Sequence, residues 1–163
     1  MFREMRRKRQ QLPQEECIEI LDKNTSGVLA VSGDDGYPYA VPLSYVYHDN
    51  KIYFHCAKTG HKLDAIRNNP KSSFCVIDAD EIIPERFTTH FKSVIAFGTA
   101  RIMEYDEIRP AIELLAEKYS PNVDGKDEEI DREYGALAMI EFTIEHMTGK
   151  EAIELTRMRK KDE

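Results

Sequence analysis

Three segments rich in strand-forming residues follow one another between residues 27 and 56, and only short turn clusters separate them. They cover residues 27–32, 37–47 and 52–56, and the clusters between them contain Gly, Asp and Asn, which favour tight turns. Short turns join antiparallel strands, whereas a parallel crossover needs about a dozen residues or more. The sequence therefore predicts antiparallel hairpins. A doubly wound α/β fold is not expected, because helices would alternate with strands throughout.

The remaining elements add few helices to this pattern. A helix is predicted over 13–23, where a proline start and two acids precede apolar residues at helical spacing. The other predicted elements are a short helix over 60–68, strands over 71–77, 91–103 and 137–145, and a helix over 105–119. Gly98 is expected to bend the long strand. The acidic stretch 78–85 is expected to be a loop, and the polar stretch 122–133 a mobile one.

This order of elements predicts a mainly β fold with helices, an antiparallel barrel that carries helices at its ends. With 163 residues and 41% hydrophobic content, the chain suffices for one domain with a real core and is short for two. We therefore expect a single domain over 1–163, with a basic N-terminal arm over 1–11 and a polar C-terminal tail over 151–163.

Charge and cysteine content exclude several classes of protein. A formal net charge of −7 argues against a general nucleic-acid surface, which shows a basic excess. No segment approaches the roughly 20 apolar residues of a membrane span, and no export signal is recognisable. Cys17, Cys56 and Cys75 form no CxxC pair, and no cysteine and histidine set has zinc-site spacing. The expectation is a cytoplasmic protein with reduced thiols, no metal site, no nucleic-acid partner and no membrane partner.

The run 51–67 places an apolar strand, a glycine turn at Gly60 and a short helix in direct succession. The first N–H groups of a helix have no intrahelical acceptor and lie at the positive end of its dipole, so they bind anions. Lys62 falls in the first turn of this helix and Lys58 lies just before the turn. The segment is therefore either an anion-binding site or an ordinary strand-to-helix connection whose lysines are solvated.

An ordered set of motifs in this chain resembles the pyridoxamine 5'-phosphate oxidase-related flavoproteins. Within that family the resemblance is strongest to the Nim-type 5-nitroimidazole resistance proteins. It extends from about residue 6 to residue 150, and the motifs that carry it are 41–45, 52–57, 60–66, 69–70, 88–94, 97–100 and 146–150. The resemblance implies an FMN-binding split β-barrel, with the FMN at the interface of a homodimer.

The resemblance also implies where the cofactor lies. The phosphate is expected at the Gly60 turn with Lys62, together with Lys92 and Ser93. The flavin ring is expected along 41–44, where Pro42 lacks a donor and suits either a ligand contact or an ordinary edge strand. The predicted cofactor-binding residues are Val41, Pro42, Leu43, Ser44, His55, Cys56, Ala57, Gly60, His61, Lys62, Lys92, Ser93 and His146.

Histidine chemistry leaves the catalytic assignment open. A histidine beside a flavin donates a proton or orients a substrate, because its pKa is ordinarily near neutrality. His55 is the first candidate for a catalytic residue and His61 the second, and either one also suits a structural role. His146 is expected to reach a flavin across the dimer interface. Cys56 and Cys75 are expected to be buried structural thiols.

The predicted function is an FMN-dependent oxidoreductase that passes electrons from a nicotinamide donor to a small acceptor such as a nitroimidazole or another nitroaromatic compound. Oxidation of vitamin B6 is not expected, because Arg157 and Arg159 lie in the polar tail and no basic substrate-phosphate set is found there. The alternative is a non-catalytic sensor or storage protein that binds flavin or haem. A pure interaction protein is the third class considered.

Overall fold

The computed structural model describes residues 2–162 and contains one seven-stranded sheet in which every pairing is antiparallel. The strand order is β2-β1-β5-β6-β7-β4-β3. The strands are β1 (Ser26–Ser32), β2 (Pro38–Ser44), β3 (Val46–His48), β4 (Lys51–Ala57), β5 (Lys71–Ile83), β6 (Thr88–Ile102) and β7 (Leu137–Glu151). The predicted mainly β, antiparallel fold is confirmed.

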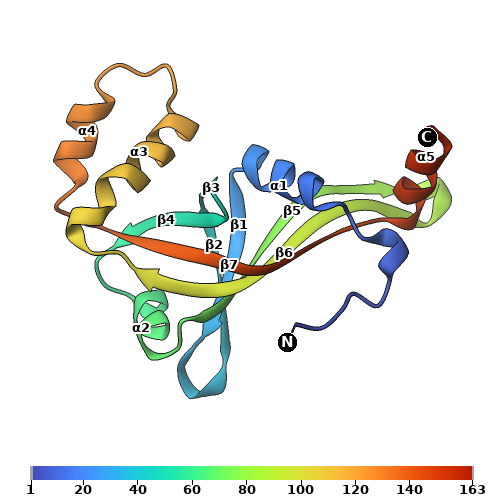
Figure 1. Ribbon diagram of the computed structural model, residues 1–163, viewed down its shortest axis with the longest axis horizontal. Coiled ribbons are helices and arrows are strands. Elements are labelled where there is room, and N and C mark those ends of the chain that lie inside the picture. Colours follow the sequence, from blue (N-terminus) through green and yellow to red (C-terminus); the bar gives the residue numbers. More distant parts are fainter. Residues whose placement is uncertain (1, 163) are drawn as a thin grey trace.

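Tyr45 shows that this sheet curls round on itself. β2 and β3 are the two edges of the sheet, yet Tyr45 alone separates them in the chain. The edges must therefore meet at this residue, which makes the sheet a barrel (Figure 1). The side chain of Tyr45 is fully buried, and its hydroxyl donates a hydrogen bond of 2.7 Å to the Leu21 carbonyl. The single strand predicted over 37–47 is thus two strands, broken where Tyr45 turns inward.

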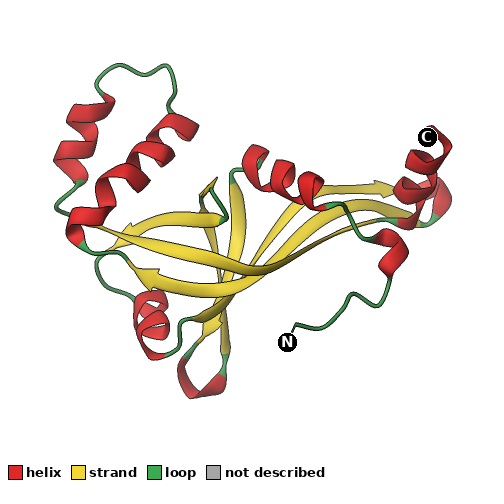
Figure 2. Ribbon diagram, in the orientation of Figure 1, coloured by secondary structure: helices red, strands yellow, loops and turns green. Residues whose placement is uncertain are grey.

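Five helices and four short 3-10 turns surround the barrel (Figure 2). The helices are α1 (Gln14–Lys23), α2 (His61–Asn68), α3 (Ile108–Tyr119), α4 (Lys126–Glu133) and α5 (Ile153–Asp162). The 3-10 turns are η1 (Lys8–Gln10), η2 (Asp34–Gly36), η3 (Pro84–Arg86) and η4 (Tyr105–Glu107). Figure 1 shows α2, α3 and α4 at one end of the molecule, and α5 with the β5–β6 hairpin at the other.

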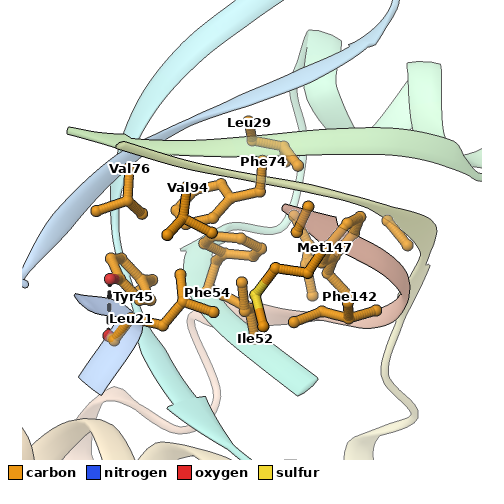
Figure 3. Packing of buried hydrophobic residues seen from close by; sticks show 14 of the residues in the cluster. Leu21, Leu29, Tyr45, Ile52, Phe54, Phe74, Val76, Val94, Phe142 and Met147 are labelled. Atoms are coloured by element: carbon orange, nitrogen blue, oxygen red, sulfur yellow. Dashed lines mark hydrogen bonds between the residues drawn. The ribbon is translucent and has the colours of Figure 1, made fainter. Parts of the chain in front are cut away.

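The barrel interior is filled by large apolar side chains (Figure 3). Phe74 packs edge-on against both Phe54 and Tyr45, with ring centroids 5.2 and 4.9 Å away. A second, smaller cluster lies outside the barrel, where α3 covers Met139 on β7 and Val46 on β3. α3 is therefore fixed to the outer face of the sheet by apolar contacts of its own.

Gly98 produces the predicted irregularity in β6. The register between β6 and β7 shifts between Phe97 and Gly98. A Cβ atom at Gly98 would lie 1.9 Å from the carbonyl oxygen of Thr143, a distance that no side chain tolerates. Glycine is required there for space, and the bulge increases the local twist of the sheet.

Two segments predicted to be irregular are ordered. The stretch 78–85 was predicted to be a loop, and this is wrong: β5 continues to Ile83, and η3 forms the hairpin tip. The backbone of this extension is paired with β6. Because most of its side chains are not buried, the strand can contain polar residues. Likewise, 122–133 is not an irregular loop throughout, because α4 begins at Lys126 with three acids in its first turn.

The two ends of the chain are also attached to the barrel. Residues 153–162 form α5, so the segment expected to be a polar tail is a helix. In the basic arm, the buried Gln10 side chain donates a hydrogen bond of 2.8 Å to the Glu151 carbonyl. The Phe2 ring stacks on His146 with centroids 4.8 Å apart. Within residues 2–162, no helix is long and apolar enough to cross a membrane.

Candidate functional site

A cavity of about 710 Å³ lies between the end of β4 and the α3–α4 pair. Four of the predicted cofactor-binding residues line it, namely Ser44 at the end of β2 and His55, Cys56 and Ala57 at the end of β4. The opposite walls come from α3, α4 and the start of β7: Ile112, Leu115, Ala116, Tyr119, Glu129, Ile130, Glu133, Ala136 and Leu137. The cavity is thus an apolar slot with a few polar groups at its edges, as small-molecule sites commonly are.

The alternation of β4 places His55 in this cavity. Phe54 points into the barrel and is fully buried, so its neighbour His55 points outward. His55 lies opposite Met139 of β7 and is exposed at the cavity wall. An exposed imidazole on a rigid strand is well placed to hydrogen-bond a ligand or move a proton at its edge. Its catalytic role stays a prediction.

The Gly60 turn follows the cavity residue Ala57 by three residues and leads into α2, whose N-terminus is a candidate anion cradle. Gly60 has φ of 139°, and a Cβ atom there would meet nothing within 4 Å. Its carbonyl accepts hydrogen bonds from the N–H groups of Leu63 and Asp64, at 3.0 and 3.2 Å. The N–H groups of His61 and Lys62 have no acceptor inside the helix and point outward at its positive end.

Lys62 lies in the first turn of α2, directly after the Gly60 turn. Burial raises the pKa of the Cys56 thiol, and the Lys62 ammonium opposes that rise. Lys62 follows Cys56 by six residues in the chain, and Cys56 lines the cavity. A ligand with an anionic end and an apolar body therefore fits the arrangement, with the anion at the turn and the body in the slot.

His61 makes contacts that favour a structural role. The His61 ring stacks on Tyr39 with centroids 4.2 Å apart. Its Nε2 atom accepts a hydrogen bond of 3.4 Å from the Asp34 N–H, and the Asp34 carboxylate lies 3.7 Å away. His61 thereby holds the turn between β1 and β2 against the N-terminus of α2.

The strip 41–44 presents its side chains to two different sides. Val41 and Leu43 pack against the barrel core, while Pro42 and Ser44 are exposed on the other face. β2 is an edge strand, and Pro42 lies opposite Val28 of β1. A flat ligand on the outer face would meet only Pro42, Ser44 and the free backbone edge of the strand.

Lys92, Ser93 and His146 lie away from the cavity within one chain. Ala57 pairs with Leu137 at one end of β7, and Ser93 pairs with Lys150 at the other. From 137 to 150 the strand extends about 40 Å along its contour at roughly 3.3 Å per residue. Lys92 forms an ion pair with Glu16 of α1. Within a single chain these residues lie at the other end of β7 from Ala57, so the phosphate site predicted to join them with Lys62 needs a second copy and stays a prediction.

His146 takes part in a different contact. It lies opposite Phe97 of β6, and its ring is covered by Phe2. In one chain, His146 therefore belongs to an aromatic group on the sheet rather than to the cavity.

The α3–α4 wall is the part of the site that sequence reasoning missed. The apolar stripe of α3 predicted a helix, but nothing in the stripe indicated which face of the barrel it would cover. The Tyr119 hydroxyl accepts a hydrogen bond of 3.0 Å from the Tyr45 N–H. Lys118 donates one of 2.6 Å to the Asn24 carbonyl. These polar contacts attach the end of α3 beside the break between β2 and β3.

An ion cluster around the buried Glu141 carboxylate lies on the other side of α3. The Glu141 carboxylate, largely buried on β7, accepts hydrogen bonds from Arg101 at 2.8 Å and Lys51 at 3.0 Å. Arg101 continues to Glu107 at 2.7 Å. Burial opposes ionisation of Glu141, yet its two cationic partners outweigh that effect and lower its pKa. Every charge in this cluster has a partner, which identifies it as a structural element.

The part of the chain that the structure describes contains no group of three or more His, Cys, Asp or Glu residues arranged to hold a metal ion. The candidate site is therefore described by its apolar slot, its anion cradle and its few polar groups.

An antiparallel barrel with an anion cradle beside an apolar slot defines a class of small-ligand binding proteins, and comparison with known proteins identifies the family. The pyridoxamine 5'-phosphate oxidase family model matches residues 13–151, so the chain belongs to that family. This agrees with the resemblance drawn from its motifs and confirms the split-barrel fold.

Three similar proteins support this assignment. An uncharacterized protein from Rhizobium meliloti is 30% identical over 149 residues, covering 86% of this chain and 93% of that protein. A crystal structure of an FAD-binding protein from Mesorhizobium loti is 27% identical, with a TM-score of 0.59, covering 87% of this chain and 96% of the other. A candidate 5-nitroimidazole antibiotic resistance protein from Bacteroides thetaiotaomicron is 15% identical, with a TM-score of 0.73, covering 86% and 85%.

Proposed function

We propose that this protein is an FMN-dependent oxidoreductase that passes electrons from a reduced nicotinamide to a small acceptor such as a nitroimidazole or another nitroaromatic compound. The observation that carries the proposal is the apolar slot lined by Ser44, His55, Cys56 and Ala57, with the Gly60 turn following Ala57 by three residues in the chain. FMN has the matching shape, a phosphate at one end and a flat, largely apolar ring at the other.

The residues of this chain would bind and orient the cofactor. The His61 and Lys62 N–H groups and the Lys62 ammonium would hold the phosphate, because each donates to an anion. The exposed backbone and side chains at the ends of β2 and β4 would contact the ring edge, with His55 in position to donate a proton to an acceptor. A bound flavin supplies the hydride and electron transfer itself. The protein excludes water and fixes the orientation.

A single phosphate cradle favours FMN over FAD, although the Mesorhizobium loti protein is described as binding FAD. Heat-releasing the cofactor from the purified protein and determining its mass distinguishes the two. Release of FMN supports the proposal, and release of FAD changes the cofactor but not the site. A protein that holds neither, and binds neither when each is supplied, contradicts it.

Electron transfer is tested on the loaded protein under anaerobic conditions. NADH or NADPH should bleach the visible flavin spectrum, and a nitroimidazole should restore it. If neither nicotinamide bleaches a bound flavin, the non-catalytic sensor or storage alternative replaces the enzyme.

We also propose a homodimer, because the outer face of the sheet is apolar and exposed. Pro42, Val28, Cys75 and Ile95 lie directly opposite one another on β2, β1, β5 and β6. Val28 is 37% and Ile95 41% exposed, and Phe97 in the neighbouring row is 40% exposed. Contiguous apolar surface of this kind is typical of protein interfaces.

A second copy would also complete the predicted site. If the two sheets face each other with their ends exchanged, Lys92 and Ser93 of one copy approach the Gly60 turn of the other. The variant Ile95→Glu should then give a monomer in light scattering and lose FMN affinity, whereas the exposed helical Glu19→Gln should change neither. A monomeric wild-type protein with full FMN affinity contradicts the dimer.

A further inference from the structure

The charged side chains that line the cavity give it a selective wall. On its α3–α4 side the ionisable side chains are Glu129, Glu133 and Tyr119, while His55 and Cys56 lie on the β4 side. Glu129 and Glu133 are four residues apart on α4, so they project from the same helix face. Ile130, between them in sequence, is buried and also lines the cavity. Among residues 2–162, no lysine or arginine lines this space.

The cations near the cavity lie at its other side. Lys62 lies in the first turn of α2, six residues after Cys56 of the cavity wall, at the cradle proposed for the phosphate. Within residues 2–162, the carboxylates of the α4 wall are therefore the acidic groups that line the slot, and the cradle proposed for the phosphate follows the end of β4. When the phosphate of a bound cofactor occupies the cradle, Glu129 and Glu133 still face the part of the slot in which a second small molecule would bind.

Arg132 reduces this negative field without cancelling it. It forms ion pairs with Glu129 and, at 3.5 Å, with Glu133, but its side chain is 69% exposed and does not line the cavity. Pairs so open to solvent are weak and screened. Over Lys126–Glu133 the chain carries five acids (Asp127, Glu128, Glu129, Asp131, Glu133) and two cations (Lys126, Arg132), a net charge of −3.

From this arrangement we infer that the cavity selects neutral or cationic aromatic electron acceptors over anionic ones, with Glu129 and Glu133 as the specificity-determining residues. The inference rests on the proposed function, since it assigns the substrate class of the same site. Its physical basis is that two carboxylates within a few ångströms of a bound aromatic ring attract a positive substituent and repel a negative one. The Glu129 and Glu133 side chains are 57% and 54% exposed, so solvent and salt partly screen this field, and the discrimination should be greatest at low ionic strength.

Three nitrophenyl probes of similar size test the inference by calorimetry: 4-nitrobenzyltrimethylammonium, 4-nitrobenzyl alcohol and 4-nitrobenzoate. The wild-type protein should bind the cation about tenfold more tightly than the anion, and the alcohol between them. Glu129→Gln with Glu133→Gln should bring the cation-to-anion ratio close to one and leave the alcohol unchanged. Arg132→Gln should move the ratio in the opposite direction.

A matched control separates the cavity wall from the net charge of the protein. Asp127→Asn with Glu128→Gln removes the same charge from the same helix, outside the cavity lining, and should leave the ratio within about twofold of wild type. An equal effect of both double variants overturns the inference, as does a wild-type protein without charge preference or one that binds none of the probes. Because the titrations run with and without flavin, failure to bind flavin is seen separately and counts against the proposed function alone.

Discussion

The two faces of β4 differ in what they contribute to the molecule. Phe54 points into the barrel, is fully buried and packs on Phe74. His55, the next residue, points out of the barrel into the cavity and is exposed. The same strand thus stabilises the fold with one face and presents binding groups with the other. A substitution at Phe54 should therefore lower stability, whereas a substitution at the neighbouring His55 should lower ligand affinity.

The largest effect is expected from the inner face. Phe54→Ala leaves a cavity among fully buried rings and should lower the free energy of unfolding by about 3–5 kcal/mol. His55→Ala, on the outer face, should stay within about 0.5 kcal/mol of wild type. Urea unfolding of both variants measures the difference. Similar losses of unfolding free energy in Phe54→Ala and His55→Ala would show that the two faces of β4 do not differ in their contribution to stability.

The ion cluster on the outer face of β7 should give the next largest effect. Glu141→Gln removes the negative charge that Arg101 and Lys51 share and replaces one acceptor oxygen with an NH2 group. It should cost about 2 kcal/mol, because both cations are partly exposed and recover some hydration. Glu145→Gln, exposed on the same strand, is the matched control and should be neutral. An unchanged stability of Glu141→Gln would show that the cluster contributes nothing.

The pH dependence of that difference follows from the lowered pKa of Glu141. A carboxyl whose pKa is lower in the folded state stabilises the protein above its unfolded pKa, near 4.3, and loses this contribution as the pH falls through the folded value. The stability gap between wild type and Glu141→Gln should therefore be full at pH 6 and shrink below about pH 4. A stability difference between the two proteins that grows as the pH falls would contradict the lowered pKa of Glu141.

A smaller effect is expected at the strand break. Tyr45→Phe keeps the buried ring and removes the hydroxyl that donates to the Leu21 carbonyl at 2.7 Å. The loss should be about 1 kcal/mol, the usual value for one buried hydrogen bond. Thermal unfolding detects a change of this size. Tyr47→Phe, whose hydroxyl makes only an exposed contact with the Asn50 N–H, should change it less.

The sequence predicted most of the strands because the residues that fill the barrel alternate with exposed ones. Gly98 was predictable for a similar reason, since a lone glycine in a long strand marks a bulge. The extension of β5 through Asp80 and Glu81 was not predictable, because the strand is held by pairing with β6 and not by an apolar pattern. α4 was missed since Ile130 is its one buried residue.

The candidate site was predicted in part. Ser44, His55, Cys56 and Ala57 do come together, because strand ends at one edge of a barrel are neighbours. Lys92 was grouped with Lys62 on the resemblance alone, and its place at the far end of the sheet depends on register, which no local pattern specifies. The α3 wall likewise depends on tertiary packing around Met139.

The measurement that tests the central claim most directly is an FMN titration, followed by flavin fluorescence, of the wild-type protein and Lys62→Ala. Lys62 is partly exposed in the first turn of α2, so its removal should leave the unfolding transition within about 0.5 kcal/mol. The account predicts tight FMN binding by the wild type and at least a tenfold higher Kd for the variant, because a charge-assisted contact to the phosphate is lost. Equal affinities in two equally folded proteins would contradict it.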